Sequence, residues 1–289
     1  MNLYTFVVPP EIGDVRLYAL ARRMLPELPE YAIKEAFAQK DVKMNGVRVS
    51  KDAIALPGAG VALYSRYGGE RLEVPILFED DHVLVVRKPI GVSCQADAKG
   101  GKTIVELVWS ALQNVNPNAS EPLLCHRLDN QTDGLLLLAK DEETQGFMMD
   151  AFKRRQIHKT YICLVKGAPA QEHAVLEAYL VKDAAKGKVR VQADARCGGL
   201  PIKTEYRVLE RGPISRLEVT LHTGRTHQIR AQLNAIGHPI VGDDQYGDRT
   251  LNKAYKAKGL MLCATKLTFS LTGPMDYLNE CSFQIEPQF

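Results

Sequence analysis

Apolar residues recur at helical spacing near the start of the chain. The residues that share this stripe are Leu17, Leu20, Ala21 and Met24. Intervals of three and four positions place them on one face of a helix. Asp14 stands just before the stripe, and its short carboxylate can accept hydrogen bonds from the first backbone amides of a helix. We therefore predict an amphipathic helix that Asp14 caps.

A second short helix and a hairpin follow. The apolar face of this helix comprises Ile33, Ala36 and Phe37. Strand-forming residues over 42–49 then surround the pair Asn45 and Gly46, which is typical of a type I′ turn between two antiparallel strands. Two helices followed by a hairpin predict a compact module.

Beyond this module, strands dominate the pattern. The strand-like segments are residues 76–78, 83–86, 134–139, 160–165, 203–209 and 216–222. Helical patterns cover residues 103–113, 142–155 and 226–236. Runs of strands broken by occasional helices favour an α+β fold with a largely antiparallel mixed sheet and flanking helices. We expect a small N-terminal α/β module over residues 1–67, a glycine-containing linker at 68–71, and a second domain over 68–289.

Composition narrows the class of protein. The chain of 289 residues is 45% hydrophobic and 25% charged, which is the balance of a folded globular protein. No apolar stretch approaches the roughly 20 residues of a membrane span, and the start of the chain lacks a secretory signal. Six cysteines lie far apart without metal-ligand spacing, so we expect reduced thiols. These features favour a cytoplasmic protein without a membrane partner.

The net charge of +3 is small, but its distribution is uneven. Residues 151–171 and 249–275 contain several lysines and arginines and no acidic residue. Each stretch is compatible with an ordinary solvated surface. Together they are also compatible with a basic path for RNA.

A polar segment over residues 124–134 leads into the apolar strand 135–139 and contains Asp129. A carboxylate on a loop that feeds a buried strand is rigidly placed yet exposed, as a nucleophile or general base must be. An aspartate in a turn with Arg127 as its surface partner is the simpler interpretation. A protein-kinase catalytic loop is excluded, because Leu128 separates Arg127 from Asp129 and the chain has no Asp-Phe-Gly motif.

The segment His126-Arg127-Leu128-Asp129, followed by Thr132 and Gly134, resembles the catalytic motif of the RluA family of pseudouridine synthases. Three further segments resemble that family's other motifs in the family's order: residues 76–91, 159–167 and 224–243. Residues 16–64 resemble the S-four RNA-binding domain that often precedes this catalytic domain. The resemblance implies a pseudouridine synthase fold that isomerises uridine in RNA.

The resemblance also assigns roles to residues. Asp129 is the catalytic carboxylate, Arg225 is its ion-pair partner, and Tyr161 stacks on the displaced uracil and is a candidate to take the proton from carbon 5. Arg225 keeps Asp129 ionised, since a nearby guanidinium opposes the effect of burial. We expect Thr226 to cap the following helix, whose buried stripe would be Ile229, Leu233 and Ile236. The expected contacts to RNA or to the base are Arg127, His126, Leu267, Lys159, His227, Gln228 and Arg230, with Lys34 and Lys43 in the N-terminal module. Arg230 is equally compatible with a solvated position.

Some positions depart from the family's pattern. Arg87 replaces a usual asparagine, Cys263 stands where histidine is common, and residues 93–95 differ from the usual sequence after Gly91. In the N-terminal module, Glu30-Tyr31 replaces a usual Ser-Arg pair. None of these removes a residue assigned to catalysis, so they affect the expected RNA contacts and target.

We expect an RNA pseudouridine synthase that acts on a flipped-out uridine in structured RNA, with ribosomal RNA favoured over transfer RNA. The carboxylate can act on the ribose, add to uracil or abstract a proton, and the sequence does not choose among these. Irregular histidine spacing predicts no metal site, and no cofactor is implied. We expect a monomer that does not bind DNA. The alternatives are a catalytically inactive RNA-binding or ribosome-assembly protein, and an enzyme that removes the base by hydrolysis.

Overall fold

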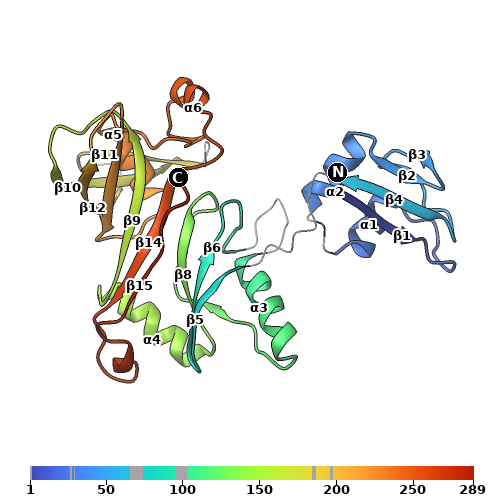
Figure 1. The fold of residues 1–289 in the computed structure, drawn as a ribbon, viewed down its shortest axis with the longest axis horizontal. Helices are drawn as coiled ribbons and strands as arrows, with labels where there is room; N and C mark the ends of the chain where they lie inside the picture. The colour runs from blue at the N-terminus through green and yellow to red at the C-terminus, as the bar shows by residue number, and fades with distance from the viewer. Residues whose placement is uncertain are drawn as a thin grey trace. The chain divides into compact units, whose positions relative to one another are not determined.

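The computed structural model describes residues 2–26, 28, 30–65, 74–95, 103–183, 187–195 and 198–289. The chain forms two compact units: Met1–Glu73 with Gln95–Thr103, and Val74–Cys94 with Ile104–Phe289 (Figure 1). The predicted linker at 68–71 lies outside the described residues. A domain boundary at residue 67 therefore stays a prediction.

The first unit contains a four-stranded antiparallel sheet and two helices. Its strands, in the order β1-β4-β2-β3, are β1 (Asn2–Val7), β4 (Gly60–Ser65), β2 (Val42–Met44) and β3 (Val47–Arg48). The helices are α1 (Leu17–Met24) and α2 (Glu30–Ala38). Asn45 and Gly46 have φ angles of 49° and 82°, as a type I′ turn requires, which confirms the hairpin. The prediction that Asp14 caps α1 was wrong, because Arg16 occupies the N-cap position and makes no side-chain hydrogen bond there.

The second unit is built on an 11-stranded sheet. Its main path, in spatial order, is β11 (Lys188–Gln192), β10 (His173–Asp183), β12 (Leu200–Glu210), β13 (Ile214–Leu221), β9 (Ile157–Lys166), β14 (Leu262–Phe269), β8 (Asp133–Ala139), β6 (Val83–Lys88) and β5 (Ile76–Glu79). β15 (Ser282–Gln284) pairs with β14, and β7 (Leu123–Leu124) pairs with β8. Among the described strands only β14 and β8 pair in parallel, so the predicted α+β fold with a largely antiparallel mixed sheet is confirmed.

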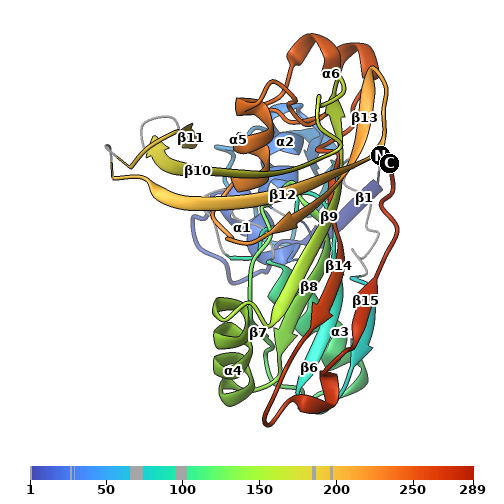
Figure 2. The same ribbon diagram turned by 90° about the vertical axis from the view of Figure 1, so that its left-hand side faces the viewer.

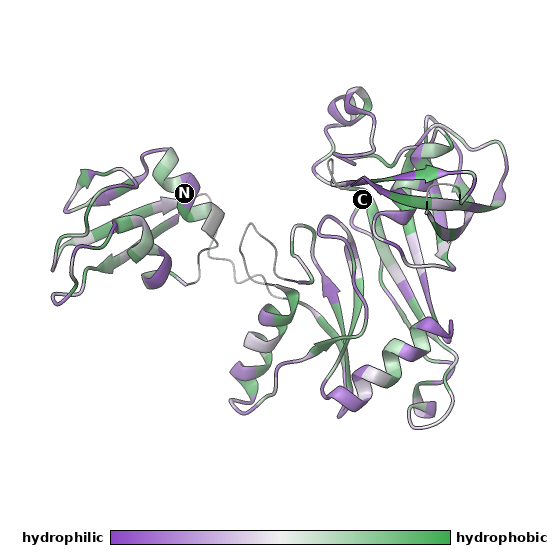
Figure 3. Cartoon of the chain, turned by 180° about the vertical axis from the view of Figure 1, so that it is seen from behind, coloured by the Kyte–Doolittle hydropathy of each residue, from purple (hydrophilic) through white to green (hydrophobic). Residues whose placement is uncertain are grey.

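Two helices cover opposite faces of the sheet at β6 and β8 (Figure 2). α3 (Ile104–Val115) packs on the face that carries Leu136 and Leu138, and α4 (Glu142–Lys153) packs on the face that carries Leu135 and Leu137. Every residue of β8 is buried, and the central strands are coloured as apolar in Figure 3. Because successive strand residues point to opposite faces, a strand covered on both faces is apolar along nearly its whole length.

Helices α5 (Gln228–Ala235) and α6 (Arg249–Tyr255) lie near the other end of the sheet. The 3-10 helix η1 (Asp276–Leu278) lies instead at the α4 end, where Leu278 belongs to the same apolar cluster as Met148. α5 packs on β12, with Ala231 against Leu180 and Ile202. In the part of the chain that is described, no helix combines the length and apolar character needed to cross a membrane.

Gly134 sits where the parallel pair of strands meets. Its φ angle is +131°, and a Cβ atom there would lie 2.4 Å from the carbonyl oxygen of Ala264. Neither the backbone conformation nor the space admits a side chain. Glycine at this position therefore lets β8 and β14 approach directly behind the segment that carries Asp129.

We expect Gly134→Ala to lower the free energy of unfolding by about 3 kcal/mol, because the clash is with backbone that cannot move aside. Gly146→Ala is the matched control, since Gly146 lies within α4 with open space around its Cβ position. That change should stabilise the protein by roughly 0.5–1 kcal/mol. Urea unfolding of both variants measures the two effects, and equal midpoints would contradict the steric argument.

Candidate active site

The segment between β7 and β8 carries Asp129 and is fastened to the segment that follows β6. The ammonium of Lys88 is fully buried and donates to the carbonyls of Pro89, Val92 and Asn130, at 2.8, 3.0 and 3.1 Å. The Gly91 amide donates to the Asn130 carbonyl at 2.9 Å. Burial lowers the pKa of Lys88 to about 8. One lysine thus ties the residue next to Asp129 to β6.

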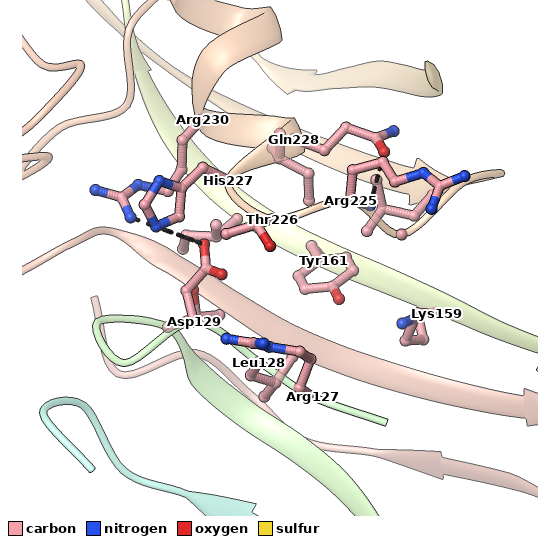
Figure 4. Close-up of a pocket in the computed structure, with 15 residues that line it drawn as sticks. Arg127, Leu128, Asp129, Lys159, Tyr161, Arg225, Thr226, His227, Gln228 and Arg230 are labelled. Carbon is pink, nitrogen blue, oxygen red and sulfur yellow. Dashed lines mark hydrogen bonds and ion pairs between the residues drawn. The ribbon is translucent and has the colours of Figure 1, made fainter. Parts of the chain in front are cut away.

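An arginine and a histidine approach the Asp129 carboxylate. Arg230 Nη1 lies 3.7 Å from Asp129 Oδ2, and His227 Nε2 lies 3.9 Å from the same oxygen. The predicted ion pair with Arg225 was wrong, since among the described residues only Arg230 and His227 lie within ion-pair distance of Asp129. Figure 4 shows the guanidinium of Arg225 directed away from it.

A second carboxylate holds Arg230 in place. Asp243 accepts from Nε and Nη2 of Arg230 at 2.7 and 2.8 Å, which leaves Nη1 facing Asp129. Burial works to raise the pKa of Asp243, but the hydrogen bonds and charge of Arg230 outweigh it, so the pKa is lowered. Arg230 is only 3% exposed, so neither of its predicted roles, RNA backbone contact or solvated residue, fits. It is a buried partner of Asp129.

The start of α5 brings His227 and Arg230 to the same carboxylate. His227 is the N-cap residue and has φ +56°, so Thr226 is not the cap. Its Nδ1 lies 3.1 Å from the hydroxyl of Tyr246. Burial lowers the pKa of His227, which favours the neutral ring. Ile229 and Leu233 are buried as predicted, whereas Ile236 is 39% exposed and lies outside the buried stripe.

A pocket opens beside Asp129 and encloses about 520 Å³, part of it open to solvent. Its apolar side chains are Leu128, Leu221, Ile229 and Leu262. Tyr161 also lines it, and burial together with the charge of Asp129 raises the pKa of the Tyr161 phenol. A pocket with apolar walls and a neutral aromatic ring suits a flat base such as uracil.

Three cations line the same pocket: Arg127, Lys159 and Arg225. Lys159 lies 5.1 Å from the centroid of the Phe152 ring, and burial lowers its pKa to about 8. Arg225 is exposed, and its backbone amide donates to the side chain of Gln228 at 3.1 Å. The pocket therefore combines one carboxylate with more positive charges than that carboxylate requires.

Three other predicted contacts are turned away from the pocket or are used in packing. His126 accepts a hydrogen bond at Nε2 from the Leu137 amide, and burial lowers its pKa, so it is a neutral structural ring. Gln228 lines the pocket, but its amide is bonded to Thr223 and Thr204. Leu267, which was predicted to pack against the base, is fully buried in the cluster beneath α4. Leu262 lines the pocket instead.

Lys34 and Lys43 belong to the first unit. Lys34 is exposed on α2, and the ammonium of Lys43 lies 5.5 Å from the centroid of the Tyr64 ring. Their predicted role in RNA binding stays a prediction.

Within the described ranges, no group of three histidine, cysteine or acidic side chains is arranged to hold a metal ion. The described cysteines are free thiols, and four of the five are buried.

Sequence reasoning missed Asp243 and Tyr246, which position Arg230 and His227. It also missed that two departures from the family pattern meet at one carboxylate. Asp133 pairs with Arg87 through two hydrogen bonds, and Cys263 Sγ lies 3.5 Å from it. The sequence offered one signal for this contact. Arg87 and Cys263 both differ from the residues usual in the family, although the residues next to them match it.

Comparisons with known proteins show the family to which the chain belongs. The family model described as RNA pseudouridylate synthase matches residues 82–235, which is more than half of the chain. Ribosomal large subunit pseudouridine synthase C of Vibrio vulnificus is 36% identical over 267 residues, covering 87% of this chain and 82% of that protein. Ribosomal large subunit pseudouridine synthase D of Nitrosomonas europaea is 30% identical, covering 85% of this chain and 73% of that protein.

Among solved structures, human RNA pseudouridylate synthase domain containing 4 is similar in fold, with a TM-score of 0.61 and 23% identity. The match covers 73% of this chain and 88% of that one. The chain belongs to the RNA pseudouridylate synthase family, and the resemblance to its RluA branch is confirmed. It is an RNA-modifying isomerase.

Proposed function

We propose that this enzyme converts uridine to pseudouridine in large-subunit ribosomal RNA, with Asp129 as the catalytic carboxylate. The observation that carries the proposal is the pairing of Asp129 with a buried, doubly anchored arginine at the edge of a pocket with an apolar wall. The names of the relatives, which are ribosomal large subunit pseudouridine synthases, support the choice of RNA. Transfer RNA remains the alternative target.

The reaction breaks the bond between ribose and uracil nitrogen, turns the base and rejoins it through carbon 5. Arg230 keeps negative charge on Asp129 stable in a site that a nucleotide would close to water. Tyr161 offers the face of a neutral ring to the detached base, because its pKa is raised. The walls then hold uracil near the ribose until it rebonds.

The N-terminal module, which we place at residues 1–67, contributes a second RNA contact through Lys34 and Lys43. Lysines supply sequence-independent attraction to phosphates, so this contact adds affinity rather than selectivity. We propose that the protein acts in the cytoplasm as a monomer, where ribosomal RNA is accessible to it, and that DNA is not a substrate.

The test is to incubate the purified protein with an unmodified transcript of large-subunit ribosomal RNA from the same organism. Pseudouridine is mapped by carbodiimide-dependent reverse-transcription stops. We expect modification at one or a few uridines and none in transfer RNA transcripts. RNA binding without modification would favour the inactive alternative, and release of free uracil would favour hydrolysis of the base.

A further inference from the structure

Lys159 and Arg225 are not committed to any anionic side chain in the described part of the chain. No aspartate or glutamate there lies within ion-pair distance of either of them, whereas Arg230 is shared among Asp129, Asp243 and Asp244. Both residues nevertheless line the pocket that contains Asp129. An uncommitted cation in a pocket indicates a ligand that brings negative charge.

The two cations belong to one corner of the pocket. A Cβ atom on Gly224, the residue immediately before Arg225, would lie 3.8 Å from the ammonium nitrogen of Lys159. The Lys159 ammonium therefore lies beside the turn that carries Arg225. Figure 4 shows both side chains on the opposite side of Tyr161 from Asp129. The pocket is therefore polarised, with its carboxylate at one end and these cations at the other.

The surroundings of Lys159 leave its charge only partly compensated. Among the described residues, its cation–π contact is with the Phe152 ring, and burial lowers its pKa to about 8. A ligand that carries a full negative charge would stabilise this ammonium. A uridine nucleotide has a neutral base and a neutral ribose, so its phosphates are the groups that match.

Resting on the proposed function, we infer that Lys159 and Arg225 together bind a backbone phosphate next to the target uridine. The base then lies against Tyr161 and the apolar wall, and the phosphate is held at the corner away from Asp129. Such a contact fixes how far the nucleotide enters the pocket. Phosphate contacts set position without reading sequence, so this subsite acts on any uridine that the rest of the RNA delivers.

The test uses a short RNA centred on the uridine identified by mapping, and a series in which each neighbouring phosphate is replaced by a neutral methylphosphonate. For the wild-type protein, we expect replacement of one particular phosphate to raise KM about 10-fold. The same replacement should have no further effect on a protein carrying Lys159→Met and Arg225→Gln. This variant should itself raise KM about 10-fold or more and reduce the slope of log KM against log salt by about 0.7 for each phosphate that the protein no longer binds.

Two further variants separate binding from other roles. Lys159→Arg keeps the charge but cannot release a proton at neutral pH, so near-normal KM and kcat in this variant support phosphate binding. Lys140→Met is the charge-matched control, because Lys140 pairs with Glu79 at the far end of β8. It should leave KM and the salt slope unchanged.

A fall in kcat with unchanged KM in Lys159→Met, without rescue by arginine, would overturn the inference in favour of proton transfer. The inference would also be overturned if, at every phosphate tested, the methylphosphonate raised KM by the same factor in the double variant as in the wild-type protein. Either result leaves the proposed function intact, provided that the unmodified protein still forms pseudouridine. If the protein modifies no uridine, the subsite is tested by binding instead of by KM. The dissociation constants of transfer RNA and ribosomal RNA transcripts are then measured at several salt concentrations. An equal salt dependence of binding in the wild-type protein and in the double variant Lys159→Met and Arg225→Gln would refute the subsite.

Discussion

Replacement of Asp129 by asparagine is expected to lower pseudouridine formation by at least about 10³-fold, the scale on which removal of a catalytic nucleophile or base acts. The amide has nearly the same shape but cannot attack, add or accept a proton as a carboxylate does. Folding should survive, because the backbone of this segment is held by Lys88 and Gly91 rather than by the Asp129 side chain. The rate is measured by tritium release from RNA that contains 5-tritiated uridine.

The matched control is Asp80→Asn, a change at a loop aspartate that caps a turn before β6 and lies outside the pocket. It should retain activity within about twofold, as surface changes usually do. RNA affinity of Asp129→Asn should stay close to that of the unmodified protein. Measurable turnover above about 10% in Asp129→Asn would remove the carboxylate from the mechanism.

The sequence was sufficient to predict the elements on which the site is built. β8 is apolar at nearly every position and is buried at all of them, so its place at the centre of the sheet was predictable. Motif order likewise predicted that the segments around Asp129, Tyr161 and residue 225 would converge on one pocket, and all three line it. Long apolar runs and local motifs are properties that a single sequence states directly.

Which arginine turns inward was not predictable. Arg225 and Arg230 lie on either side of the start of α5, and the helix begins at Gln228 rather than at Thr226. Arg225 precedes the helix, so its direction is set by the turn through His227, whose φ of +56° no local pattern predicts. The partner Asp243 is 13 residues further on, and no periodicity links it to Arg230.

Contacts made across the sheet were also beyond reach. Arg87 meets Asp133 because β6 and β8 pair with Lys88 opposite Gly134, a register that only the folded chain reveals. Leu267 lies beyond a register shift between Ala264 and Lys266, and it faces the core beneath α4 instead of the pocket. A bulge of one residue changes the direction of every later side chain in a strand.

Removal of the Arg230 side chain should have the second largest effect, and it should act on both stability and activity. Arg230→Met leaves Asp243 buried without its cation, and uncompensated buried charges cost roughly 3–5 kcal/mol of unfolding free energy. The activity should fall about 10²-fold or more, because the guanidinium no longer stabilises charge at Asp129. Urea unfolding and tritium release measure the two losses.

Arg225→Met is the comparison that decides between the two arginines. Arg225 is exposed and forms no ion pair among the described residues, so its removal should change the unfolding free energy by no more than about 0.5 kcal/mol. Adding Asp243→Asn to Arg230→Met should recover most of the lost stability, since the buried charge is gone and the asparagine oxygen still accepts from the Gln245 and Tyr246 amides. Activity should stay low in this double variant, because nothing replaces the cation beside Asp129. Recovery of activity together with stability in the double variant would mean that Arg230 only supports the fold. A larger loss of stability in Arg225→Met than in Arg230→Met would mean that Arg225, and not Arg230, forms the ion pair with Asp129.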